Sequence, residues 1–138
     1  MIESRVLVWL LLEDEGGVLL ALRKEDRPPF AQQWTLPGDV MAIDESAMEA
    51  IVRCARQDLD VGVRSEDFLA TLELADGSVE YAVNVFQVGV VGQPRFRESG
   101  PYADVRWLTP ADLAADDSLS MPQALRDILT STADRSTP

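Results

Sequence analysis

Three side chains between residues 54 and 58 have the spacing that a metal-binding or catalytic helix face requires. Cys54, Gln57 and Asp58 stand three and four positions apart, so a helix would place them on one face. Hard cations such as Mg²⁺ prefer carboxylate oxygens, whereas a thiol is a soft ligand. Asp58 is therefore the member of this trio that suits a divalent cation.

The residue types that are absent narrow the chemistry further. The sequence contains no histidine and one cysteine, which excludes imidazole bases, imidazole metal sites and multi-cysteine metal sites. Acid–base chemistry must then come from carboxylates, lysine, tyrosine, the thiol or a bound metal ion. Cys54 has two interpretations: a small buried helix residue, which is the commoner role, or a nucleophile next to Arg53 and Arg56.

The net charge of −12 argues against a nucleic-acid polymer as partner, because two polyanions repel each other. A small phosphorylated ligand remains compatible with this charge, through a local basic cluster or a bridging divalent cation. The longest apolar run, Val6 to Leu12, is far shorter than the roughly 20 residues of a membrane helix. The N-terminus also lacks a basic signal-peptide region. We therefore expect a cytoplasmic protein without membrane contact.

A helix over residues 46–60 is the clearest element that the sequence predicts. Ser46 and Glu49 have the spacing of a capping box at its start, and Gly62 can take the positive φ that ends a helix. Apolar residues at helical spacing are expected to form its core face: Met48, Ile51, Val52, Ala55 and Leu59.

The remaining pattern predicts strands before and after this helix. Two apolar runs, 5–12 and 18–23, flank a Gly-Gly turn and predict a hairpin. Thr109 and Pro110 predict the start of a short helix. Further strands are expected at 70–75, 79–91 and 105–108, a loop at 24–33, and a last helix at 121–130. This order indicates an α+β fold in one domain, residues 1–130, with a flexible tail at 131–138.

Residues 34–61 resemble the Nudix hydrolase family. Trp34-Thr-Leu-Pro-Gly38 matches the family's W-x-L-P-G lead-in, and the residues that follow align with its box, G-x5-E-x7-R-E-U-x-E-E-x-G-U, where U is a bulky aliphatic residue. Arg23 at the end of a strand and Arg106-Trp107 before a short helix fit the family's flanking segments. The resemblance implies the Nudix fold, a mixed β-sheet sandwiched between α-helices.

The box is degenerate in this chain. Glu45, Arg53 and Val61 match the pattern. Ala55 and Asp58 match it in part, because alanine is smaller than the pattern's bulky aliphatic residue and aspartate is shorter than its glutamate. The first glycine, two of the glutamates and the second glycine are replaced, in that order, by Asp39, Cys54, Gln57 and Asp60. In the family, the residues at Glu45 and Arg53 form an ion pair that ties the loop to the helix.

The resemblance also implies catalytic roles. The family's helix carboxylates bind Mg²⁺ or Mn²⁺, which bridge a diphosphate and activate a water, so Asp58 is the expected metal ligand beside Glu45 and Arg53. Glu98 lies in a loop where many members carry a further acid. Additional carboxylate candidates are Asp39, Glu80 and Asp104. Glu98 and these three candidates each have a simpler interpretation as a solvated or turn residue.

Ligand contacts are expected from Arg23, Phe30, Trp34 and Tyr81. Aromatic rings stack on planar groups, and a guanidinium suits a phosphate or carboxylate. The alternative interpretation makes Trp34 and Tyr81 core residues and Arg23 a surface charge.

Two functions follow from these observations. The first is a metal-dependent pyrophosphohydrolase that acts on a nucleoside diphosphate linked to another group. The second is a divergent, non-hydrolytic Nudix-fold protein without a metal, either a small-molecule binder or sensor or a repurposed biosynthetic enzyme; the replaced glutamates motivate it. Many relatives pair as homodimers, which is a further expectation for this chain.

Overall fold

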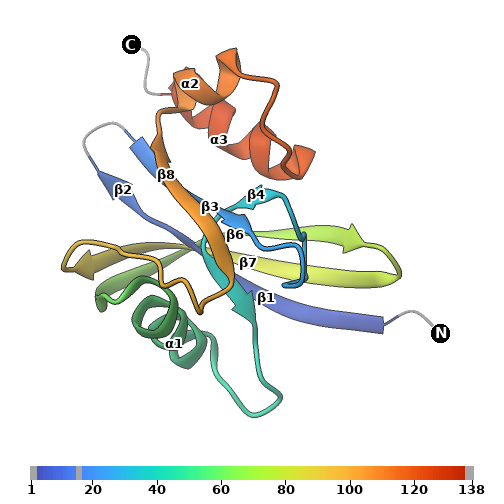
Figure 1. Cartoon of the computed structure of the whole chain (residues 1–138), viewed down its shortest axis with the longest axis vertical. Coiled ribbons are helices and arrows are strands. Elements are labelled where there is room, and N and C mark those ends of the chain that lie inside the picture. The colour runs from blue at the N-terminus through green and yellow to red at the C-terminus, as the bar shows by residue number, and fades with distance from the viewer. Residues whose placement is uncertain (1–2, 15–16, 136–138) are drawn as a thin grey trace.

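The computed structural model describes residues 3–14 and 17–135, with side chains as far as residue 130. Its strands fall into two sheets with helices on both sides (Figure 1). The strands are β1 (Glu3–Leu11), β2 (Glu13–Asp14), β3 (Gly17–Arg23), β4 (Trp34–Thr35), β5 (Gly38–Val40), β6 (Gly62–Asp76), β7 (Val79–Val91) and β8 (Tyr102–Leu108). The helices are α1 (Ala47–Leu59), α2 (Pro110–Ala115) and α3 (Gln123–Arg135).

Both sheets have four strands, but only the first is mixed. Its order is β5-β1-β7-β6, in which β1 and β7 run parallel and the other neighbours antiparallel. In the second sheet, β3 pairs antiparallel with β2, β4 and β8. This arrangement confirms the α+β fold with mixed β-structure between helices.

The hairpin expected between residues 5–12 and 18–23 forms only at its tip. Glu13 and Asp14 pair with Val18 and Gly17, and the Leu19 nitrogen donates to the Leu12 oxygen at 3.1 Å. The expected pairing of the two long runs is wrong, because β5 and β7 occupy both edges of β1. Strands β1 and β3 therefore lie in different sheets.

Helix α1 begins as its sequence predicts and ends differently. The Ser46 hydroxyl accepts from the Glu49 nitrogen, and the Glu49 carboxylate accepts from the Ser46 nitrogen, which completes the capping box. The left-handed residue at the other end is Asp60, with φ of 57°, and not Gly62, which is already in β6. Aspartate tolerates this conformation better than most residues.

The buried face of α1 is rotated relative to the predicted one. Met48 is 42% exposed and Val52 is only half-buried, so these two predictions are wrong. Ala50 and Cys54 take their places beside Ile51, Ala55 and Leu59. Three of these five side chains are small, which lets the helix approach the first sheet closely.

Several element boundaries also differ from the predicted ones. Strand β6 starts at Gly62 instead of residue 70, because its polar first half is held by pairing with β7 and not by an apolar pattern. Strand β8 starts at Tyr102, and α3 continues to Arg135. The tail boundary expected after residue 130 thus falls inside α3, and residues 136–138 lie outside the described part of the chain. Helix α2 has the predicted start, with Thr109 and Asp112 forming a capping box.

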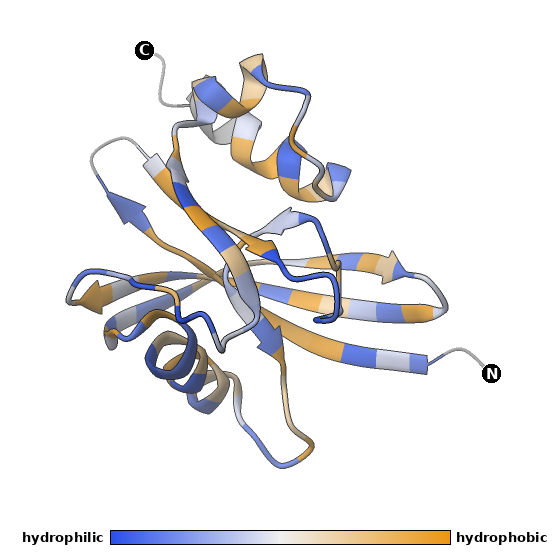
Figure 2. Ribbon diagram, viewed as in Figure 1, coloured by the Kyte–Doolittle hydropathy of each residue, from blue (hydrophilic) through white to orange (hydrophobic). Residues whose placement is uncertain are grey.

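Two apolar clusters fill the spaces between strands and helices. One lies on the α1 side of the first sheet and includes Ile51 and Leu59; the other includes Leu113 and Leu125 from α2 and α3. In Figure 2, apolar and hydrophilic bands alternate along the strands. None of the described helices combines the length and hydropathy needed to cross a membrane.

Candidate functional site

The lead-in to the box is held in place at Gly38. Its nitrogen donates to the Tyr102 hydroxyl at 2.9 Å, and its carbonyl oxygen accepts from Arg23 Nη1 at 3.2 Å. A side chain at this position would bring a Cβ within 1.9 Å of the Val8 oxygen, and φ is +154°. Glycine is therefore required where the chain passes over β1.

Arg23 is buried, so the alternative of a surface charge is wrong. Only 5% of the residue is exposed. Its Nε donates to the Arg27 oxygen and its Nη2 to the Pro28 oxygen, both at 3.1 Å, and the guanidinium lies 5.7 Å from the centre of the Tyr102 ring. Arg23 therefore fixes loop 24–33 against Gly38 from the inside.

The ion pair expected between Glu45 and Arg53 is present. Arg53 Nε donates to Glu45 Oε2 at 2.7 Å, and Nη2 donates to Oε1 at 2.9 Å, a two-point contact. Arg53 Nη2 also reaches the Val40 oxygen at 3.1 Å, and the Ala42 nitrogen donates to Glu45. The Arg53 hydrogen bond, followed by the Ala42 one, lowers the pKa of Glu45 from 4.5 to about 2. The loop before α1 is thus locked to the helix.

Asp58 is the half-buried carboxylate of the box helix. Burial, and then the nearby charge of Asp39, raise its pKa from 3.8 to about 6. Arg23, Arg53 and Arg27 oppose this shift. Asp39 is also half-buried and accepts from the Val40 nitrogen at 2.8 Å. Two of the predicted carboxylates, one on β5 and one on α1, therefore lie within electrostatic reach of each other.

The other members of the predicted helix face do not join this pair. Cys54 is 1% exposed, and burial, followed by the charge of Asp58, raises its pKa to about 12. A protonated and enclosed thiol is a poor nucleophile, so its packing role is the one the structure supports. Gln57 is exposed, and Asp60 pairs with Arg97 at 3.4 Å.

A divalent cation such as Mg²⁺ requires several oxygen ligands. Among the described residues, no group of three Asp, Glu, Cys or His side chains could hold a metal ion. Mg²⁺, however, is often held by one or two carboxylates together with the phosphate oxygens of a substrate. Asp39 and Asp58 have the residue type that such a substrate-completed ion uses, whereas the described residues offer no complete set of protein ligands.

The remaining candidate carboxylates lie elsewhere. Asp104 contacts Arg106 at 3.2 Å, and Glu80 lines a recess on the first sheet. The Glu98 side chain is exposed, while its backbone oxygen accepts from the Lys24 ammonium group. A role for Glu98 stays a prediction.

The predicted aromatic contacts are mostly core packing. The Phe30 ring lies 6.0 Å from that of Trp9 and 5.8 Å from that of Tyr81, with Phe30 itself almost fully buried. Trp34 is buried, with the Arg106 guanidinium 5.0 Å from its ring centre. Of the three predicted rings, Tyr81 also lines the recess on the first sheet. The ligand roles of these aromatic residues stay predictions.

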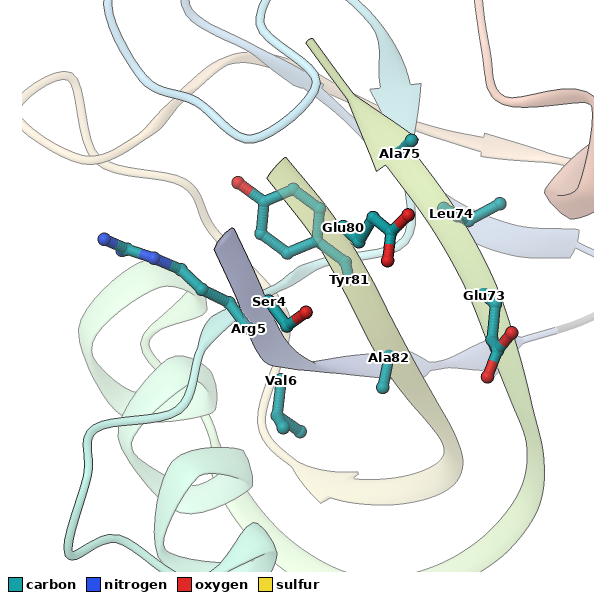
Figure 3. A pocket seen from close by; sticks show the side chains of 9 residues that line it. All are labelled: Ser4, Arg5, Val6, Glu73, Leu74, Ala75, Glu80, Tyr81 and Ala82. Carbon is teal, nitrogen blue, oxygen red and sulfur yellow. The ribbon is translucent and has the colours of Figure 1, made fainter. Parts of the chain in front are cut away.

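That recess lies across β1, β7 and β6 and has a volume of about 390 Å³ (Figure 3). A second recess of about 530 Å³ shares Ser4, Arg5 and Val6 with it and reaches Glu45. Arg5 is the one cation that lines either recess, and Glu3 already pairs with it at 2.6 Å. Since Glu73 and Glu80 also line the first recess, its charge does not suit a phosphate.

Sequence reasoning missed Tyr102, which is buried beside Gly38. Burial, and then the charge of Asp58, raise the pKa of its hydroxyl. Its neighbours along the chain gave no signal, because Tyr102 reaches a backbone group 64 residues away.

These features define a class: a mixed-sheet sandwich whose capped helix is tied to the preceding loop by a Glu–Arg pair. Residues 1–128 match the family model described as the NUDIX domain, so this chain belongs to the NUDIX family. It is 27% identical over 124 residues to nucleoside triphosphatase NudI of Escherichia coli O139:H28, which covers 83% of this chain and 88% of NudI.

Two further similarities extend this comparison. The low-salt glycan biosynthesis protein Agl8 of Haloferax volcanii is 37% identical over 68 residues, which is 49% of this chain and only 42% of Agl8. Among solved structures, the MutT protein from Methanosarcina mazei Go1 superposes with a TM-score of 0.81 at 20% identity, covering 99% of this chain and 98% of that one. The last similarity shows the fold alone.

Proposed function

We propose that this chain hydrolyses nucleoside phosphates at the face of α1 that carries Asp58. Three features support this proposal: Asp39 and Asp58 are both half-buried, the charge of Asp39 raises the pKa of Asp58, and the Glu45–Arg53 ion pair is formed. Two close carboxylates favour a bound cation, because a cation removes their mutual repulsion. NudI, the relative with the longer match, is named a nucleoside triphosphatase, which supports the substrate class.

In this proposal, Asp39 and Asp58 would hold one Mg²⁺ or Mn²⁺ ion together with the substrate's phosphates. When bound, such an ion neutralises phosphate charge and lowers the pKa of a coordinated water. The chain's own residues position the site. Glu45 and Arg53 fix the loop that precedes α1, and Arg23 and Tyr102 fix Gly38, next to Asp39. With two carboxylates in place of the family's larger set, turnover is expected to be slow.

The test is phosphate release from a panel of nucleoside triphosphates, nucleoside diphosphates and nucleotide sugars, with Mg²⁺, Mn²⁺ or EDTA. Nucleotide sugars belong in the panel because Agl8 is named for glycan biosynthesis. We expect metal-dependent turnover that Asp58→Asn abolishes and Asp39→Asn reduces. Asp67→Asn, an exposed carboxylate on β6, serves as the matched control and should leave the rate unchanged. No phosphate release from any substrate of the panel, at any metal concentration, would refute the proposal.

The second candidate is a phosphate-ligand binder or metal-independent enzyme that does not hydrolyse its ligand. It is favoured by the lack of any three-donor group among the described side chains. Calorimetry with the same panel separates the two candidates, since binding without product would support the second. Gel filtration of the same sample checks the expected homodimer.

A further inference from the structure

Two loops meet beside the C-terminal end of α1. In loop 24–33, the Lys24 nitrogen donates to the Pro101 oxygen at 2.9 Å, and the Lys24 ammonium group donates to the Glu98 oxygen. Arg27 Nη2 reaches the Ser99 oxygen at 3.4 Å. Loop 24–33 therefore lies against loop 92–101, and the Lys24 and Arg27 side chains lie at the seam between them.

The second loop is in turn joined to the box helix. The Arg95 nitrogen donates to the Leu59 oxygen at 2.8 Å, and Arg97 Nη2 lies 3.4 Å from Asp60 Oδ1. More than half of the Arg97 and Asp60 side-chain surfaces is exposed. Arg97 therefore lies at the C-terminal end of α1, and Lys24 and Arg27 contact the same loop that carries Arg97. These cations lie close together along the chain fold although the net charge is −12.

Arg27 also acts electrostatically on the box carboxylate. Together with Arg23 and Arg53, it is among the charges that lower the pKa of Asp58. Arg23 and Arg53 are already committed to backbone oxygens and to Glu45, whereas Arg27 is exposed and makes one long contact. Arg27 therefore has free donors within electrostatic reach of Asp58.

Polyphosphate charge must be neutralised at this site, and the chain has few metal ligands left to do so. Cys54 and Gln57 stand where the family's pattern has glutamates, and no three-donor group occurs in the described chain. A guanidinium binds two phosphate oxygens at once, and an ammonium group acts as a point charge. The acidic lining of the recess on the first sheet does not offer this chemistry.

We propose that Lys24, Arg27 and Arg97 form a metal-independent binding site for the phosphate groups of the ligand. This inference rests on the proposed function for the nature of the ligand, a nucleoside di- or triphosphate. The site lies along the seam between the two loops, and the charge of Arg27 acts on Asp58 from there. Side chains of the two loops thereby replace part of the charge neutralisation that additional metal ions would provide.

The probe for this site is inorganic pyrophosphate, titrated calorimetrically into the full chain in EDTA. We expect binding without metal, weakened about tenfold or more by Arg27→Ala and by Lys24→Ala, since each removes a charged hydrogen bond. Arg64→Ala, on exposed β6, changes the net charge equally and should leave the affinity unchanged. Unchanged melting temperatures confirm that the exposed substitutions have not unfolded the protein.

Three results would overturn the proposal: no binding in EDTA, unchanged affinity in Arg27→Ala and Lys24→Ala, or equal weakening by Arg64→Ala. A different set of results would refute the proposed hydrolysis. Asp58→Asn should abolish turnover and yet bind pyrophosphate in EDTA at least as tightly, because a repelling charge is gone. A chain that binds pyrophosphate through Arg27 but releases no product would refute the hydrolysis and support the phosphate site.

Discussion

The hydroxyl oxygen of Tyr102 lies 2.9 Å from the backbone nitrogen of Gly38. Tyr102 begins β8 in the second sheet, and Gly38 begins β5 in the first. Arg23, at the end of β3, donates to the Gly38 oxygen at 3.2 Å. The second sheet therefore sets the position of the chain that leads into the box helix.

Tyr102→Phe should destabilise the protein by about 2 kcal/mol, because it leaves the buried Gly38 nitrogen without its partner. The free energy of unfolding in urea is the measurement. Tyr81→Phe is the matched control, since Tyr81 is a buried tyrosine whose ring packs on Phe30. Equal losses in the two variants would contradict the role given to the Tyr102 hydroxyl.

Glu45→Gln should cost about 2 kcal/mol at neutral pH, through loss of a partly buried two-point ion pair. The pKa of Glu45 falls from 4.5 to about 2 on folding. The pair's contribution is then complete above about pH 4.5 and disappears as the pH falls toward 2. Urea unfolding of both proteins at pH 7 and near pH 2.5 should show this convergence. A constant difference across that range would contradict it, and Glu73→Gln controls for the loss of an exposed carboxylate.

When metal is absent, the effect of Asp58 on the free energy of unfolding should have the opposite pH dependence to that of Glu45. Its pKa rises from 3.8 to about 6 in the folded protein, so the folded state binds the proton more tightly than the unfolded state. Stability should therefore fall as the pH rises from about 4 to 6. In EDTA at pH 7, Asp58→Asn should be more stable than the natural chain by about 1 to 3 kcal/mol. The two proteins should become similar near pH 4, and a variant that is less stable at pH 7 would contradict this account.

The Cys54 thiol should be unreactive in the folded protein. Because it is 1% exposed and its pKa is raised to about 12, labelling by a disulfide reagent should proceed no faster than opening of the fold. Cys54→Ala should cost about 1 kcal/mol and keep any hydrolytic activity. Rapid labelling without denaturant, or loss of turnover in a folded Cys54→Ala variant, would instead support Cys54 as a nucleophile.

Local signals predicted the parts of this fold that local interactions determine. The helix starts at Ser46 and Thr109 were predicted, because the residues that cap each helix lie within three positions of each other. The strand at 79–91 was predicted because this segment is long and rich in β-branched residues. The Glu45–Arg53 pair was found through the spacing of the box, which is kept although Cys54 and Gln57 replace two of its glutamates.

Long-range pairing decided what the sequence could not show. Apolar runs in β1 and β3 look alike, and only their partners assign them to separate sheets. The first half of β6 is polar and is a strand because β7 pairs with it. Arg23 looks like a surface charge until the backbone oxygens of Arg27, Pro28 and Gly38 surround it.

The burial of Cys54 bears on how this chain could change in the future. A glutamate restored at that position would put a charge into a tightly packed core cluster, at a cost of several kcal/mol. Gln57 is exposed, so a glutamate there meets no such barrier. The two substitutions therefore differ in reversibility. Gln57→Glu adds a carboxylate at the surface, whereas Cys54→Glu requires the cluster packed around Cys54 to rearrange.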